Sequence, residues 1–195
     1  YNYEERGQYA VLLKPRTDSR DGERKIQSRM GLSASAEYVD EFLKEISTIW
    51  KKENTEYRYQ GKKVDAVLVD EAQFLSEAEI DTLSDLVDFY NIPVICYGLR
   101  TDFRNRLFPG SRRLMEIADV IEEVPTVCWC GKRAQCNTRY ANGEIVREGA
   151  QIMLGSNESY VALCRKHYKE GKLWKEAGAE NETSTRRNCK IMEKE

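Results

Sequence analysis

Residues 64–73 read VDAVLVDEAQ, in which an aliphatic run over 64–69 closes on two adjacent carboxylates, Asp70 and Glu71. Continuous aliphatic runs of this kind are typical of strands in a parallel sheet whose two faces are both buried. Similar runs occupy residues 8–14 and 93–98, and segments with apolar residues at helical spacing lie between the runs. This alternation of strand and helix predicts an α/β fold with a parallel sheet covered by helices.

Two segments carry the helical signal. Apolar residues recur every three or four positions over 39–50, which predicts a helix with one core-facing stripe. Ser76 followed by Glu79 forms a capping-box pattern, and we expect a second helix to begin there. The charged stretch 16–30 is expected to form a loop.

Composition narrows the class of protein. The chain has 195 residues, a formal net charge of −2, 41% hydrophobic and 33% charged residues. This apolar content suffices for a folded core, and the balanced charge argues against general nucleic-acid or membrane-surface binding. The longest apolar run, residues 92–99, is too short to span a bilayer.

The end of the 64–69 strand is a candidate catalytic site. Ligands of open α/β sheets bind beyond the carboxyl ends of the strands, where Asp70 can hold a hydrated Mg²⁺ and Glu71 can accept a proton. Acidic residues also follow strands simply as loop or capping residues, so the pattern by itself leaves both interpretations open.

Two further segments leave strands at the same predicted edge. Residues 98–110 place aromatic rings beside arginines, which suits a planar base with phosphates, although Phe103 and Phe108 can equally anchor a surface loop. Asp18 and Arg20 follow the first strand, and an arginine there can clamp phosphate oxygens or simply be solvated.

Four residues of metal-ligating types form two close pairs, Cys128 with Cys130 and Cys164 with His167. Four protein ligands suit a closed tetrahedral Zn²⁺ site of structural type. A disulfide is the competing interpretation. Cys136 has no partner in register, and we interpret it as incidental.

Changes in residue composition along the sequence divide the chain into three parts. Residues 1–125 form the predicted α/β nucleotide-binding domain, and 126–168 form a small zinc-bound β subdomain with a hairpin at Asn142-Gly143. Residues 169–195 are strongly charged and are expected to be a mobile tail.

Taken together, these segments resemble the cytosolic, type II thymidine kinases, most closely the enterobacterial branch. The resemblance covers about residues 1–170, in the family's order. The matching stretches are 1–7 (YNYEERG), 18–20 (DSR), 28–32 (SRMGL), 69–75 (VDEAQFL), 96–104 (CYGLRTDFR), 128–131 (CWCG), 155–160 (GSNESY) and 164–168 (CRKHY).

The resemblance implies a P-loop, RecA-like kinase fold and transfer of the γ-phosphoryl group of ATP to the 5′-hydroxyl of thymidine. Glu71 matches the family's general base, and the ATP and Mg²⁺ site would comprise Asp70, Glu71, Ala72, Gln73, Asp18 and Arg20. Thymidine would be bound by Phe74, Leu99, Phe103, Phe108, Tyr160 and the backbone of a loop called the lasso: Gln151, Ile152, Met153, Leu154 and Gly155.

The same resemblance implies a cytoplasmic homotetramer that uses ATP with Mg²⁺, carries structural Zn²⁺, is inhibited by dTTP, and has neither a nucleic-acid nor a membrane partner. The family's phosphate loop has no match here, because no Gly-Lys-Ser or Gly-Lys-Thr occurs in the chain. We expect the first strand and this loop, on the order of 20 residues, upstream of Tyr1.

Three alternatives stay open on the sequence. A relative without a phosphate loop would be a pseudoenzyme. Asp70-Glu71-Ala72-Gln73 also fits an ATPase of the helicase class, although the chain is short for two motor lobes. The cysteine-rich part would suit a non-catalytic zinc-ribbon binding module.

Overall fold

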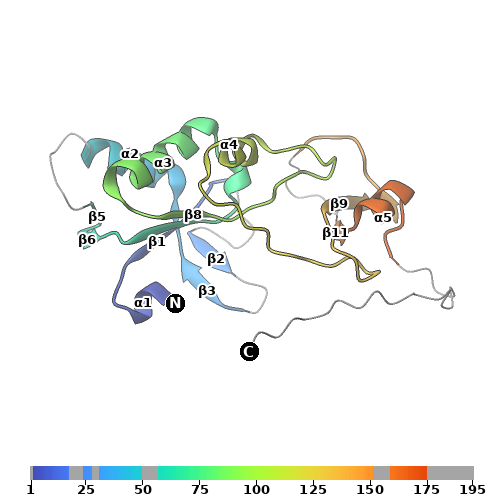
Figure 1. The fold of residues 1–195 in the computed structure, drawn as a ribbon, viewed down its shortest axis with the longest axis horizontal. Helices are drawn as coiled ribbons and strands as arrows, with labels where there is room; N and C mark the ends of the chain where they lie inside the picture. The colour runs from blue at the N-terminus through green and yellow to red at the C-terminus, as the bar shows by residue number, and fades with distance from the viewer. Residues whose placement is uncertain (1, 18–23, 28–30, 50–56, 152–158, 175–195) are drawn as a thin grey trace, which may run out of the picture. The chain divides into compact units, whose positions relative to one another are not determined.

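The structure, a computed structural model, describes residues 2–17, 24–27, 31–49, 57–151 and 159–174 (Figure 1). The chain folds into two compact units, each with a hydrophobic core of its own. Unit 1 comprises Tyr1–Val124 and Arg147–Ser156, and unit 2 comprises Pro125–Val146 and Asn157–Glu195.

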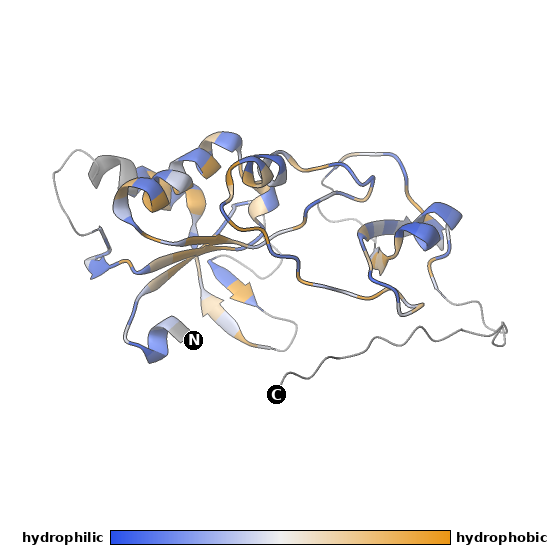
Figure 2. Ribbon diagram, viewed as in Figure 1, coloured by the Kyte–Doolittle hydropathy of each residue, from blue (hydrophilic) through white to orange (hydrophobic). Residues whose placement is uncertain are grey.

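Unit 1 is built on a four-stranded parallel sheet with the strand order β4-β1-β7-β8. Its strands are β1 (Ala10–Lys14), β4 (Glu37–Tyr38), β7 (Ala66–Val69) and β8 (Val94–Cys96). The predicted strands at 8–14, 64–69 and 93–98 are confirmed as β1, β7 and β8. The predicted α/β class with a parallel sheet is therefore confirmed, and Figure 2 shows these strands as the most hydrophobic part of the unit.

The helices of the sheet are α2 (Val39–Ile49), α3 (Glu77–Tyr90) and α4 (Pro109–Ile117). Figure 1 shows all three on one side of the sheet. Helix α3 begins at the predicted capping box: Ser76 Oγ accepts a hydrogen bond from the Glu79 N–H, and the Glu79 carboxylate accepts one from the Ser76 N–H. No helix in the described part of the chain combines the length and the apolar character needed to cross a membrane.

The two faces of the sheet are covered unequally. Val11, Leu13, Val67 and Val69 are buried, and they belong to the core that the helices share. The alternate row pairs Leu12 with Leu68 and Leu68 with Ile95. Leu12 and Leu68 are half-buried and Ile95 is 38% exposed. On the same face Lys14 and Ala66 are fully buried. The described residues therefore cover the second face in part, and the expectation of complete burial on both faces fails at Ile95.

Two short hairpins were not predicted. Strand β2 (Lys25–Gln27) pairs with β3 (Ser33–Ser35), and β5 (Arg58–Tyr59) pairs with β6 (Lys62–Lys63). The expectation of a loop over 16–30 is therefore wrong for residues 25–27. The reason is that a two-stranded ribbon with little burial needs only backbone pairing, so it leaves no aliphatic run in the sequence.

Unit 2 is a three-stranded antiparallel sheet followed by a short helix. The strands are β9 (Cys136–Ala141), β10 (Glu144–Ile145) and β11 (Ser159–Leu163), in the order β10-β9-β11, and the helix is α5 (Arg165–Glu170). The predicted hairpin at Asn142-Gly143 is confirmed, with both residues at positive φ (52° and 80°). Leu173 is buried in the core of unit 2, so packing continues past the predicted boundary at 168.

One close approach in unit 1 sets the position of α4. A Cβ atom on Gly110 would lie 2.6 Å from the carbonyl oxygen of Ala72, 2.7 Å from that of Leu75 and 2.9 Å from that of Gln73. These carbonyls belong to or follow a 3₁₀ turn, η1 (Ala72–Phe74). Since all three atoms are backbone atoms, they cannot move aside as a flexible side chain would.

We therefore predict that Gly110→Ala lowers the free energy of unfolding by about 1–3 kcal/mol through overpacking. An exposed helical glycine would respond in the opposite direction, because alanine there gains about 0.5–1 kcal/mol. Urea unfolding measures the change, and Arg112→Ala on the exposed side of α4 is the matched control, expected within about 0.5 kcal/mol of the original protein. A Gly110→Ala protein as stable as the original would contradict the close packing.

Candidate active site and metal centre

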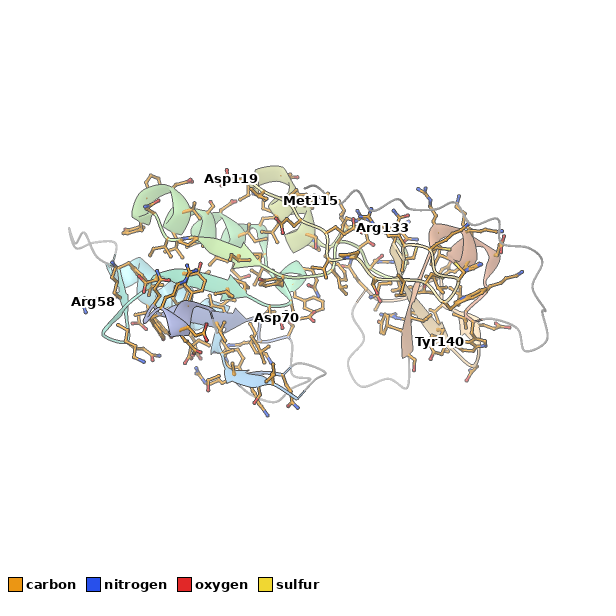
Figure 3. All side chains as sticks on the ribbon, turned by 60° about the horizontal axis from the view of Figure 1, so that its bottom comes forward. Arg58, Asp70, Met115, Asp119, Arg133 and Tyr140 are labelled. Carbon is orange, nitrogen blue, oxygen red and sulfur yellow. The ribbon has the colours of Figure 1, made fainter. Side chains whose placement is uncertain are left out.

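The chain turns sharply at the carboxyl end of β7. The Asp70 N–H still donates to the Leu13 carbonyl of β1 (2.9 Å), but Glu71 adopts the left-handed conformation, with φ 52° and ψ 35°. Asp70 Oδ1 accepts a hydrogen bond from the Glu71 N–H (2.9 Å), which stabilises the turn. A non-glycine residue in this conformation is uncommon and marks a strained turn. Both carboxylates are half-buried, and Figure 3 shows Asp70 at the end of the sheet.

Turn η1, which follows, is tied to the end of the neighbouring strand β8. The Ala72 N–H donates to the Tyr97 carbonyl (2.9 Å). The side chain of Gln73 is buried, and its amide nitrogen donates to Glu71 Oε2 while its amide oxygen accepts from the Leu99 N–H (3.0 Å). The ends of β7 and β8 therefore form one connected structure around Glu71.

A fully buried carboxylate, Asp102, organises the loop that follows β8. Its two oxygens accept hydrogen bonds from the backbone N–H groups of Arg104 and Arg106 (2.9 and 3.0 Å), the Arg104 guanidinium (2.9 and 3.0 Å) and the Gln151 amide (3.2 Å). Burial alone would raise the pKa of Asp102, but these donors and the arginine charge hold the pKa below its usual value. Arg104 also donates to the Gly149 carbonyl (3.3 Å), so residues 149–151 are joined to the loop.

The predicted thymidine-contacting residues of this region divide by burial. Phe74 and Phe108 pack edge to face, with ring centroids 5.6 Å apart. Phe103 and Phe108 are buried, whereas Leu99 is 41% exposed. The structure thus brings one aromatic pair together beside η1 and leaves Leu99 accessible.

Several predicted site residues lie elsewhere. Asp18, Arg20 and residues 152–155 are outside the described part of the chain. Tyr160 belongs to β11 of unit 2, where its hydroxyl accepts a hydrogen bond from Arg139 Nε (2.8 Å). Arg139 is fully buried, and it was not singled out from the sequence.

The predicted metal ligands come together in unit 2. The ligand atoms of Cys128, Cys130, Cys164 and His167 all lie within 4.8 Å of one another. Cys128 Sγ is 3.3 Å from His167 Nδ1, and Cys130 Sγ is 4.0 Å from Cys164 Sγ. Ligand sulfurs around one tetrahedral Zn²⁺ with bonds of about 2.3 Å are separated by about 3.8 Å. The spacing of the four ligand atoms therefore fits a single tetrahedral ion.

The distances and the pKa values of the thiols bear on the choice between a metal site and a disulfide. A separation of 4.0 Å excludes a disulfide between Cys130 and Cys164. Burial acts to raise the pKa of Cys128, but hydrogen bonds from backbone groups and from His167 bring the pKa below its usual value. Burial and the neighbouring thiols raise the pKa of Cys130. Cys136 is buried outside the four-residue cluster, as predicted.

Trp129 lies between Cys128 and Cys130 in the sequence, and it holds the imidazole of His167 in place. Its ring stacks on that of His167, with centroids 4.0 Å apart and planes 4° from parallel. Its indole N–H donates to the Lys172 carbonyl (3.3 Å). The stack restricts rotation of the imidazole and so helps to direct Nδ1 toward the thiols.

Sequence reasoning missed the roles of Asp102 and Trp129. Asp102 lies in a predicted loop segment. Asp and Asn are turn-forming residues, so Asp102 followed by Asn105, which adopts a φ of 59°, could have indicated a tight turn here. Trp129 lies between two ligands, but a spacer position carries no signal of its own.

Comparison with known proteins identifies the family. The model of the family described as thymidine kinase matches residues 1–168. A thymidine kinase of Haemophilus influenzae is 46% identical over 171 residues, which is 87% of this chain and 86% of that protein. Thymidine kinases of Legionella pneumophila (strain Paris) and Pasteurella multocida are 44% and 43% identical, over 90% and 87% of this chain and 82% and 86% of those proteins. The chain belongs to the thymidine kinase family.

Proposed function

We propose that this protein phosphorylates thymidine with ATP. The observation that carries the proposal is the carboxylate pair Asp70 and Glu71, held at the carboxyl end of β7 in a chain of this family. In the reaction the 5′-hydroxyl oxygen of thymidine forms a bond to the γ-phosphorus, the bond to the ADP oxygen breaks, and the hydroxyl proton leaves. The products are thymidine monophosphate and ADP.

Glu71 is the proposed general base. Its carboxylate is half-buried at the end of a buried strand, and Gln73 holds one of its oxygens. Phosphoryl transfer depends mainly on positioning and charge neutralisation. A base that is held in a fixed place, and so receives the hydroxyl proton in the right geometry, fits this requirement. Asp70 is proposed to hold the Mg²⁺ that neutralises phosphate charge in ATP.

The reaction also requires a loop that binds the phosphates of ATP, and such a loop would follow a further strand of the sheet. Among the described residues β8 pairs only with β7, so its other edge offers backbone groups to a further strand. The half-exposed row Leu12, Leu68 and Ile95 offers an apolar face beside it. These features support the proposal that a strand from outside residues 1–195 joins β8 and brings the phosphate loop to Asp70. Asp18 and Arg20 are proposed to complete the ATP site.

Thymidine is proposed to be bound by residues of unit 1. Phe74, Leu99, Phe103 and Phe108 would contact it beside η1, while the backbone of 151–155 would hold its base. The hydrogen bonds from Gln151 and Arg104 support this, because they tie the start of the proposed loop to the segment after β8.

The ion of unit 2 is proposed to be structural Zn²⁺, since four protein ligands leave no open position for chemistry. Such thiol ligands require a reducing compartment, which supports a cytoplasmic location. A homotetramer and inhibition by dTTP are proposed from the family resemblance. Family membership favours the kinase over the helicase-type ATPase and the zinc-ribbon module, and an assay of thymidine-dependent ADP release separates them.

We expect Glu71→Gln to lower kcat for thymidine by about 10²- to 10⁴-fold, because the amide cannot take up the hydroxyl proton. ADP release by the full-length enzyme measures kcat, and binding of a fluorescent ATP analogue should stay unchanged. Glu77→Gln, in the exposed first turn of α3, is the matched control and should keep full activity. Substantial turnover by Glu71→Gln would remove Glu71 from the role of base.

We predict one tightly bound zinc ion per chain. Elemental analysis after dialysis should find it in the original protein and should find it lost from Cys164→Ser, which removes one of four ligands. Cys136→Ala is the control, because Cys136 lies in the same core outside the cluster, and it should retain the metal. Stoichiometric zinc in Cys164→Ser would show that the ligand set is different.

Asp102→Asn should raise the KM for thymidine by about tenfold or more and change the KM for ATP little, since it weakens the link to residues 149–151. Asp119→Asn, at an exposed position, is the control. Equal thymidine KM values in Asp102→Asn and the original protein would contradict the proposed link.

The same variant should change how stability depends on pH. Because the pKa of Asp102 is lowered in the folded protein, its charge stabilises the fold above the unfolded pKa of about 3.9, and this contribution is lost as the pH falls below that value. The stability difference between Asp102→Asn and the original protein should therefore shrink in acid.

A further inference from the structure

We propose that Gln73 is a positioning residue that holds the carboxylate of Glu71 for proton transfer. The inference rests on the proposed role of Glu71 as the general base. Gln73 is only 1% exposed, although glutamine is usually a surface residue. Its side chain joins Glu71 Oε2, two residues earlier, to the backbone N–H of Leu99, 26 residues later.

The orientation of the Gln73 amide follows from its partners. The Leu99 N–H is a donor only, so it requires the amide oxygen, at 3.0 Å. The NH₂ group is then directed to the other side, where an ionised carboxylate can only accept. The Leu99 backbone thereby ensures that Gln73 presents a donor, rather than an acceptor, to Glu71.

The space for this amide is provided by Gly98. A Cβ atom on Gly98 would lie 2.5 Å from Gln73 Oε1 and 3.1 Å from the Gln73 backbone nitrogen. Contacts under 3.0 Å essentially never occur for real Cβ atoms. The segment after β8 therefore approaches η1 closely enough for the bridge only because residue 98 has no side chain.

The anchor itself is fixed by the start of α4. The Ser111 hydroxyl donates to the Leu99 carbonyl (2.6 Å), and the neighbouring Gly110 lies against the carbonyl oxygen of Gln73. Leu99 is thus held on its carbonyl side by α4 while its N–H holds Gln73. The result is a continuous series of contacts from helix α4 through Leu99 and Gln73 to the carboxylate of Glu71.

This arrangement suits a general base. A glutamate side chain has three rotatable bonds, and an unrestrained one samples many orientations. The Gln73 amide reduces this freedom, because its own orientation is fixed by the Leu99 N–H and its NH₂ group binds one carboxylate oxygen. The resemblance placed Gln73 in the ATP site, but its buried side chain bonds to Glu71 and to the Leu99 backbone. We therefore assign the Gln73 side chain to Glu71, with its effect on the phosphorylation step and not on nucleotide affinity.

The test uses the full-length enzyme and Gln73→Met, which keeps the length of the side chain and removes the amide. We expect kcat for thymidine to fall by about 10- to 100-fold, while the KM values for thymidine and ATP stay within about twofold. Gln135→Met, at an exposed position in unit 2, is the matched control and should be unchanged. Gln73→Asn provides a second variant that keeps a buried amide but is one methylene too short to reach both partners, and it should also lower kcat.

A double-mutant cycle with Glu71→Gln separates positioning from general structural damage. If Gln73 acts through Glu71, adding Gln73→Met to Glu71→Gln should change the remaining rate by less than about twofold. Equal losses in both backgrounds, or a raised KM for ATP with unchanged kcat, would overturn the inference. Failure of the proposed function would look different, because the original enzyme would not phosphorylate thymidine or Glu71→Gln would retain its turnover.

Discussion

The turn at the end of β7 is the constraint on which the rest of unit 1 depends. Glu71 occupies the left-handed conformation, and the Asp70 carboxylate stabilises it by accepting the Glu71 N–H. This conformation directs the chain into η1 instead of continuing the strand, so both carboxylates stay at the sheet edge. The carbonyls of η1 then form the surface that receives Gly110, and α4 is positioned as a consequence. A few residues of strained backbone therefore locate the proposed base, its neighbouring turn and a helix.

Two carboxylates near this turn are held by different kinds of donor. Glu71 is held by the neutral amide of Gln73, which orients the group and adds no charge. Asp102 is held by the guanidinium of Arg104 and by backbone N–H groups, and its pKa is lowered as a result. A carboxylate paired in this way remains ionised and acts as a structural centre for a loop.

The hydrophobic core of unit 2 is small in the described part of the chain. Its buried apolar residues are few, and two of them, Cys128 and Cys164, belong to the metal-ligand cluster. So small a core supplies little folding free energy, and metal ligation commonly makes up the difference in domains of this size. The stack of Trp129 on His167 adds aromatic contact directly to a ligand. The proposed zinc and the hydrophobic core are thus parts of a single cluster.

The sequence by itself determined the features that depend on local pattern: the parallel strands, the capping box of Ser76, the turn at Asn142-Gly143 and the two pairs of metal ligands. Each leaves a signal because spacing along the chain dictates it. Only the tertiary structure decided that one face of the sheet is buried less completely than the other, that residues 25–27 form a ribbon, and that Gln73 and Asp102 are centres of hydrogen bonding. The bonds from Gln73 to Leu99 and from Asp102 to Gln151 join groups 26 and 49 residues apart, and hydrogen-bond partners at such separations have no periodicity that a single sequence can display.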